Sequence, residues 1–347
     1  MQQILPSYKD PLFSILLIIT IILVTVIATH GLSIYSKKKS KNDLLEFLKK
    51  FKNTDCTFDL NVTIFESNML KPLILLAEGF NSNGEYHKAI NIYLYLIDNI
   101  NDYKIKNNLL NSLGQLYLKA GFLERAKHIF IKILKYSPRN IESLYNLSIV
   151  YDMLNEYNKA LLLIEPLDIL KEDTENFKNY FEYKIVLTTY KNSKKQKIIE
   201  LEKMIKNRPS LYRIILSDLF ILDNHLAWRI LDYTRIQEVL DILWMLPKSK
   251  LDLDIISKHN TLSTIYYAKG YIQKPYVQSD IFSVDMLAIS KKSGFDRADL
   301  NFLYLCDICK QSFSLSFNRC SNCMAINSII VEGKIAEKYK QTNYSIF

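Results

Sequence analysis

The sequence predicts an all-α protein built as a helical solenoid, and three observations support this prediction. Hydrophobic residues make up 49% of the 347 residues and charged residues 23%, which excludes collagenous, low-complexity and wholly disordered chains. Only 8 Gly and 8 Pro occur, too few for a β fold with many turns. The 23 Tyr and 17 Phe suit long helices that pack through rings, and a helical pattern repeats along the chain.

The first element is an apolar stretch, LFSILLIITIILVTVIAT, over residues 12–29. Between Asp10 and Lys37 the only ionisable side chain is His30. A helix needs about 20 apolar residues to cross the bilayer core, so we expect a transmembrane anchor over residues 12–35. No clear small-residue cleavage site follows, which favours a retained anchor over a secretory signal peptide.

Lysines follow the expected anchor directly. Residues 37–52 contain seven Lys against Asp43 and Glu46, whereas the residues before the anchor are nearly neutral. This asymmetry places the C-terminal body in the cytoplasm by the positive-inside rule. We assign residues 36–69 to a basic juxtamembrane segment and the first helices.

The central part of the chain carries a repeated pattern. One unit starts at Asn107, and its residues follow the order L…LG..Y…G….A…F…P, which is typical of a tetratricopeptide repeat. These residues are Leu110, Leu113, Gly114, Tyr117, Gly121, Ala126, Phe130 and Pro138. Similar units precede and follow it. We therefore expect tetratricopeptide repeats over residues 70–292, clear over 70–174 and degenerate after that.

The residue types of the repeat have physical reasons. Gly84 and Gly121 would end the first helix of a unit where a positive φ is needed, and Pro138 would stop a second helix. Small residues stand where the two helices of a unit would cross closely: Ala77, Ala89, Gly114, Ala126 and Ala160. Solenoids of this kind expose a face that binds peptides or helices, so the fold implies a partner rather than a reaction.

A second basic cluster lies between Lys191 and Arg208, where seven cationic residues oppose Glu200 and Glu202. A solvated helix face and a surface for an anionic partner both fit this cluster. No aromatic residues interleave with the lysines, as a stacking surface for nucleic acid would require, so we expect no nucleic-acid partner.

The most specific chemical signal is near the C-terminus, where four of the five cysteines form two C-x-x-C pairs: Cys306, Cys309, Cys320 and Cys323. Each pair can direct two thiolates at one ion from a tight turn, so together they predict a tetrahedral site for one zinc or iron ion. Disulfides or free thiols are the alternatives, and a reducing cytosol counts against disulfides. A closed four-thiolate site has no open position for substrate, which indicates a structural role. We assign residues 300–332 to this module and residues 333–347 to a tail.

No other combination of residues indicates chemistry. The five His are scattered, Cys56 stands alone, and no phosphate-binding glycine loop or H-E-x-x-H motif occurs. The sequence therefore predicts a non-enzymatic protein without catalytic residues.

The order of anchor, repeats and cysteine pairs resembles the lipopolysaccharide assembly protein B family of Gram-negative bacteria, whose C-terminal module is rubredoxin-like. The resemblance is sharpest at Tyr304, Phe313 and the four cysteines. It differs at three positions, where the family usually has Gly, Trp and Pro and this chain has Lys310, Asn318 and Ser321. The family's module packs on its solenoid, and a short linker over Ser293 to Leu303 would permit the same here.

The resemblance implies a non-enzymatic adaptor at the inner membrane, single-pass, with its body in the cytoplasm. Such proteins bring the deacetylase that commits carbon to lipid A synthesis to a membrane-anchored AAA+ protease. They are also proposed to organise other lipopolysaccharide assembly proteins. Membrane lipid is a further implied partner, and a homo-oligomer is compatible with this interpretation. Two other interpretations stay open: a general tetratricopeptide scaffold for another membrane complex, and an iron redox carrier.

Overall fold

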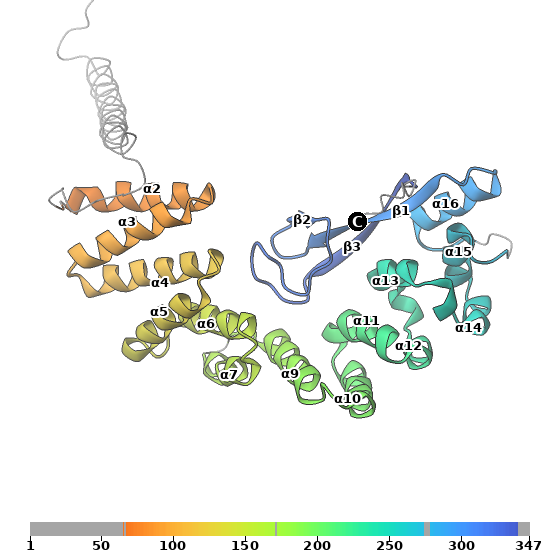
Figure 1. Ribbon diagram of the computed structural model, residues 1–347, viewed down its shortest axis with the longest axis horizontal. Coiled ribbons are helices and arrows are strands. Elements are labelled where there is room, and N and C mark those ends of the chain that lie inside the picture. Colours follow the sequence, from red (N-terminus) through yellow and green to blue (C-terminus); the bar gives the residue numbers. More distant parts are fainter. Residues whose placement is uncertain (1–64, 66, 171, 274–277, 339–347) are drawn as a thin grey trace, which may run out of the picture. The chain divides into compact units, whose positions relative to one another are not determined.

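The computed structural model describes residues 65, 67–170, 172–273 and 278–338 (Figure 1). The described chain is mostly helical and has one small sheet near its C-terminus, which confirms the predicted helical character. The expected anchor and the lysines after it lie outside the described residues. Within the described ranges, no helix combines the length and apolar character needed to cross a membrane. The chain divides into two compact units, Met1–Phe122 and Leu123–Phe347, each described by itself.

The described part of the first unit consists of three α-helices preceded by a 3₁₀ turn. The helices α2 and α3 pack on each other, and α4 packs on α3. Apolar residues at helical spacing, such as Leu73 and Ala77 on α2 and Leu96 on α3, form their buried faces. The bounds are η2 (Ser67–Met69), α2 (Leu70–Ser82), α3 (Tyr86–Asn99) and α4 (Tyr103–Lys119).

The second unit continues as a series of helices (Figure 1). The α-helices are α5 (Leu123–Tyr136), α6 (Ile141–Met153), α7 (Tyr157–Leu162), α8 (Ile164–Ile169), α9 (Glu175–Thr189), α10 (Lys194–Asn207), α11 (Tyr212–Leu222), α12 (Asn224–Ile230), α13 (Leu240–Met245), α14 (Leu253–Lys258), α15 (Asn260–Lys269) and α16 (Phe282–Lys292). The 3₁₀ helices are η3 (Pro209–Leu211), η4 (Tyr233–Val239) and η5 (Lys248–Lys250).

The turns within the repeats adopt the conformation that the sequence predicted. Gly84, Gly121 and Asn155 occupy equivalent turns, with φ values of 77°, 80° and 61°. Gly270 caps the C-terminus of α15 with φ 88°. Helix α5 ends at Tyr136, shortly before the predicted stop. These helices therefore end next to residues that adopt a positive φ at little cost, mainly glycine.

The small residues expected at the helix crossings are buried. Ala77, Ala89, Ala126 and Ala160 have no exposed surface. From α9 onward the core also contains large buried rings, among them Phe181, Phe220, Trp228 and Tyr266. The core of this later part of the chain is therefore rich in aromatic side chains.

A three-stranded antiparallel sheet follows the last helix. Its strands are β1 (Ala298–Cys306), β2 (Ser312–Phe313) and β3 (Ile329–Glu337), in the order β2-β1-β3. The β1–β3 register runs from Ala298 opposite Glu337 to Cys306 opposite Ile329. The chain is therefore not purely α-helical, and residues 298–303 of the expected linker are strand. Leu300, Phe302, Tyr304 and Cys306 alternate along β1, a period-two pattern that predicts this strand.

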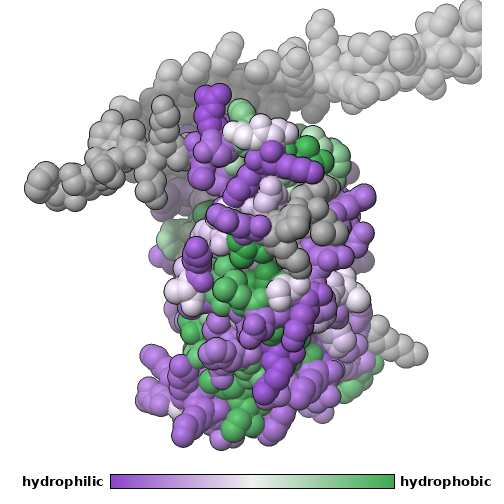
Figure 2. All heavy atoms as spheres, turned by 90° about the vertical axis from the view of Figure 1, so that its right-hand side faces the viewer, coloured by the Kyte–Doolittle hydropathy of each residue, from purple (hydrophilic) through white to green (hydrophobic). Residues whose placement is uncertain are grey.

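The sheet packs on the last helices of the same unit. Strand β1 contacts α16, and β3 contacts η4, α13 and α16. A Cβ atom at Gly333 would lie 3.2 Å from the Ser283 Oγ atom and 3.4 Å from a methyl carbon of Leu240, so glycine permits this close approach of β3. Seen from the side of α14 and α16, apolar side chains gather between hydrophilic ones (Figure 2). The exposed apolar residues of these two helices are Leu253, Phe282, Met286 and Ile289.

Candidate metal centre

Two loops with the same backbone pattern carry the four cysteines. In the first loop, the Cys306 N–H donates to the Gln311 carbonyl at 2.9 Å, and the Lys310 N–H donates to the Cys306 carbonyl at 2.9 Å. In the second loop the Cys320 N–H donates to the Ala325 carbonyl, and the Met324 N–H donates to the Cys320 carbonyl, at 2.8 and 2.9 Å. Each C-x-x-C pair is thus held in a tight turn.

The residue after the second cysteine of each pair closes its turn with a positive φ. Lys310 has φ 57° and Met324 has φ 62°, in the left-handed region that favours glycine. The Lys310 side chain pairs with Asp307 at 2.8 Å. Both turns therefore fold despite a Cβ atom at the position where glycine fits best.

The two turns bring the four sulfur atoms together. The Cys306 and Cys323 Sγ atoms are 3.6 Å apart, and those of Cys309 and Cys320 are 3.7 Å apart. All four lie within 4.8 Å of one another. A tetrahedral ion with bonds of about 2.3 Å to sulfur requires sulfur atoms about 3.8 Å apart. The four thiols are therefore placed to hold a single metal ion.

The thiols differ in their acidity. Burial opposes ionisation of Cys306, but N–H donors from Cys309 and Ile308 and the Ser328 hydroxyl outweigh it and lower the Cys306 pKa to about 6. Burial raises the pKa of Cys323 to about 12, and hydrogen bonds with the neighbouring thiols act in the same direction. Without an ion the four groups share protons, so binding of a cation would release protons from the site.

The site has a protected side and an open side. Cys306 and Cys320, the first cysteine of each pair, have no exposed surface. Cys309 is partly exposed, and Cys323 reaches the surface. A bound ion would thus lie close to solvent on one side and be covered by protein on the other.

A buried ion pair joins the second cysteine loop to α6. The Arg319 Nε and Nη2 atoms donate to the Asp152 Oδ2 atom at 2.9 and 2.7 Å, and both side chains are nearly buried. The Arg319 Nη1 atom donates to the Met324 carbonyl at 2.8 Å, and its guanidinium lies over the Tyr180 ring. Because Arg319 directly precedes Cys320, this pair fixes the loop on the helices.

A second buried cluster fixes β1 to α11 and α13. Both Arg213 terminal nitrogens donate to the two Asp241 carboxylate oxygens at 2.7 Å. The Tyr304 hydroxyl donates to the Asp241 Oδ2 atom at 3.0 Å, and Arg213 also donates to the Ser316 hydroxyl at 3.2 Å. Burial, together with the Asp241 carboxylate, raises the Tyr304 pKa to about 12. The tyrosine of the cysteine motif is therefore an attachment of the module to the helices.

Sequence patterns identify the cysteines and Tyr304 but not their partners. Asp152 and Arg319 are separated by 167 residues, and Tyr304 and Asp241 by 63. Within the part of the chain that the structure describes, no group of three or more His, Cys, Asp or Glu is close enough to hold a metal apart from the four cysteines.

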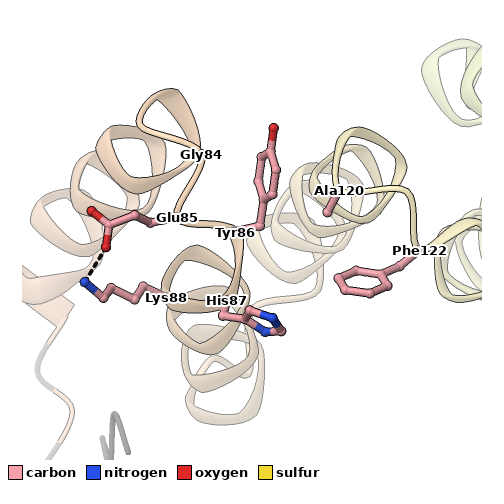
Figure 3. Close-up of a pocket in the computed structure, with 7 residues that line it drawn as sticks. All are labelled: Gly84, Glu85, Tyr86, His87, Lys88, Ala120 and Phe122. Carbon is pink, nitrogen blue, oxygen red and sulfur yellow. Dashed lines mark ion pairs between the residues drawn. The ribbon is translucent and has the colours of Figure 1, made fainter. Parts of the chain in front are cut away.

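The first unit has a small surface pocket at the turns of its repeats (Figure 3). In this pocket the His87 ring points towards Phe122, whereas Glu85 and Lys88 pair with each other. The lining residues are Gly84, Glu85, Tyr86, His87, Lys88, Ala120 and Phe122. The one carboxylate of this lining, Glu85, is therefore already paired.

The fold and the site define a mostly helical protein with a C-terminal four-cysteine module. The chain is similar to lipopolysaccharide assembly protein B of Haemophilus influenzae, with 26% identity over 157 residues. This match covers 43% of the chain and 39% of the relative, and it confirms the resemblance predicted from the sequence. No protein-family model matches the chain.

Proposed function

We propose that this protein is a non-enzymatic, membrane-anchored adaptor in lipopolysaccharide assembly. The observation that carries the proposal is the four-cysteine module, which is fixed to a helical body by the buried ion pair of Arg319 with Asp152 and by the hydrogen bond of Tyr304 to Asp241. Similarity to a protein named for lipopolysaccharide assembly supports the pathway. A repeat surface supports binding of a partner rather than a reaction.

The proposed metal ligands are Cys306, Cys309, Cys320 and Cys323, around one zinc or iron ion. When bound, the ion supplies a cross-link between the two cysteine loops. The protein's own residues then carry this rigidity to the helices, through Arg319 to Asp152 and through Tyr304 to Asp241. With all four positions taken by thiolates, the site has no place for a substrate.

The proposal gives each of five segments a role. Residues 12–35 anchor the chain in the inner membrane, and residues 36–69 lead to the cytoplasmic body. Residues 70–292 form the repeats that bind partners, residues 300–332 form the metal module, and residues 333–347 form the tail, whose first five residues complete strand β3. The partners are the deacetylase that commits carbon to lipid A, a membrane AAA+ protease and other assembly proteins. By presenting the deacetylase to the protease, the protein would limit lipid A synthesis.

The half-life of that deacetylase tests the proposal. It is measured in cells with the full chain, with a chain lacking residues 1–36, and with neither. We expect the shortest half-life with the full chain, because anchoring raises the effective concentration of body and protease in one plane. Immunoblots confirm equal amounts of both chains. An unchanged half-life across all three would favour a general scaffold for another membrane complex.

The exposure of Cys323 favours a second candidate function, that of an iron redox carrier. An iron ion at this site would have one side close enough to solvent for electron exchange with a partner. Metal analysis of the purified full chain separates the candidates. Zinc supports the structural role, whereas iron with reversible one-electron reduction by a partner would support the carrier.

A further inference from the structure

The basic cluster around α10 separates into two halves in the structure. In the C-terminal half, each of three cationic residues has a carboxylate partner: Lys203 with Glu200 at 2.8 Å, Lys206 with Glu202 at 3.0 Å, and Arg208 with Glu182. In the N-terminal half, Lys191, Lys194 and Lys195 are exposed, and no carboxylate of the described chain forms an ion pair with them. We call these three residues the lysine patch.

The stability of α10 does not explain the lysine patch. Lys194 and Lys195 are the first two residues of the helix, whose first turn contains no acidic residue. The Ser193 side chain makes no capping hydrogen bond there. Because the N-terminus of a helix carries partial positive charge, lysines at this position oppose the helix dipole. Their charge therefore costs stability unless an external anion balances it.

A further lysine lies beside the patch on the same helix. Lys197, two residues after Lys195, forms no ion pair with a carboxylate of the described chain, although Asp218 is near enough to interact with it. The Asp218 carboxylate accepts a hydrogen bond from the Tyr183 hydroxyl at 2.6 Å. Ile199, one turn along α10, is 45% exposed and adds an apolar contact beside the lysines.

We propose that the lysine patch binds the anionic lipid headgroups of the membrane in which the chain is anchored. Lysines close to an anionic leaflet are attracted to it, and the attraction adds with each one. The anchor proposed over residues 12–35 keeps the body next to that surface, so a weak patch suffices. The inference rests on the anchor but not on the deacetylase or the protease. No aromatic side chains interleave with the patch, which disfavours nucleic acid.

Amine labelling of the full chain in lipid nanodiscs tests the proposal. Discs contain phosphatidylcholine alone or an equal mixture with phosphatidylglycerol, and mass spectrometry reports acetylation at each lysine. We expect labelling of the lysine patch to fall about fivefold or more in the anionic discs and to recover in about 1 M NaCl, where screening is nearly complete. Lys203 and Lys206, on the same helix, should label equally in both discs.

Two charge-matched variants refine the test. Lys194→Gln with Lys195→Gln removes two charges from the patch, and Lys203→Gln with Lys206→Gln removes two paired charges from the same helix. Lys191 serves as the reporter. The first variant should lose its lipid-dependent protection, the second should keep it, and circular dichroism confirms that both are folded.

Three outcomes would overturn the proposal. The first is equal labelling of the patch in both discs by a chain that inserts. The second is protection that needs an added acidic protein instead of anionic lipid, which would assign the patch to a protein partner. The third is a full chain that does not remain with the discs, which would remove the anchor as well. A longer deacetylase half-life on loss of the protein is independent of all three.

Discussion

At the scale of single residues, the closing turn of the first cysteine loop carries strain that one substitution can relieve. Lys310 has φ 57°, a conformation that costs a residue with a Cβ atom about 1–2 kcal/mol. A glycine at this position would remove that cost, but part of the gain in stability is lost because glycine is more flexible in the unfolded chain. We expect Lys310→Gly to raise the free energy of unfolding of the module by about 0.5–1 kcal/mol, measured by chemical denaturation.

Lys310→Ala is the matched control. It removes the same ion pair to Asp307 but keeps the Cβ atom at the positive φ. It should not stabilise the module. If both substitutions raised the free energy of unfolding equally, the cause would be the lost charge of Lys310 and not its backbone conformation.

The buried ion pair between Arg319 and Asp152 gives a second prediction. Arg319→Met keeps the length of the side chain but leaves the Asp152 carboxylate buried without its partner. Breaking a buried pair in this way costs about 3–5 kcal/mol. Denaturation monitored together with protease sensitivity of residues 298–337 measures the loss.

Lys159→Met is the control for that substitution, since its ion pair with Glu156 lies at the surface and should contribute little. Adding Asp152→Leu to Arg319→Met should recover part of the stability, because the unpaired charge is then gone. No recovery would mean that the arginine acts through packing on Tyr180 instead.

These residues show how far sequence reasoning reaches at the residue scale. The cysteine ligand set follows from a local pattern, since each pair spans one turn. Asp152 and Arg319 could not be paired in advance, because their contact depends on how α6 and the second cysteine loop are placed by the whole fold. Tyr304 was visible as part of a motif, but its partner Asp241 was not.

At the scale of elements, the contact between α9 and α11 predicts a pH dependence. The Tyr183 hydroxyl donates to the Asp218 Oδ2 atom at 2.6 Å, and burial raises the Asp218 pKa above its ordinary value of 3.8. The folded state therefore holds the proton more tightly than the unfolded state does. The contribution of Asp218 to stability is highest below pH 3.8 and falls as the pH rises through the raised pKa.

Asp218→Asn tests this dependence, because the amide cannot ionise. The difference in unfolding free energy between wild type and variant should shift in favour of the variant as the pH rises from about 3.8 to neutrality. Denaturation curves across that range measure it. A difference that stays constant with pH would contradict the assigned cause.

The elements also divide into those that the sequence predicts and those that it does not. Helix pairs with glycine or asparagine turns were predictable because a positive φ and a close crossing need particular residue types. Strand β1 was placed in part within a linker, and β3 was divided between the metal module and the tail, although their alternating apolar residues indicate strand. A short run of alternating apolar residues beside a metal-binding motif is easily taken as part of the motif and not as a strand.

At the scale of the whole second unit, the module and the helices depend on each other. Removing the metal, or Cys306→Ser, should unfold residues 298–337, because metal binding contributes folding free energy. Asp152 would then lose Arg319, and Asp241 would lose Tyr304 but keep Arg213, so α6 and, to a smaller extent, α13 should also lose protection in hydrogen exchange. Helices α2 to α4 belong to the other unit and should keep theirs.

Cys56→Ser is the control for that experiment, since this cysteine stands outside the ligand set. It should change neither metal content nor exchange. Loss of protection in α2 to α4 after metal removal would show that stability is not organised by these units. Full protection of α6 would show that Arg319 does not hold the module in solution.

The pair between Arg319 and Asp152 also sets an order of events during synthesis. Asp152 is synthesised 167 residues before Arg319, which corresponds to roughly 10 to 30 s at ordinary translation rates. Over that interval the acidic site on α6 is complete but open, and it closes only when nearly the whole chain has been made. The final fold of the second unit is therefore reached after translation, and the C-terminal module is the last part to dock.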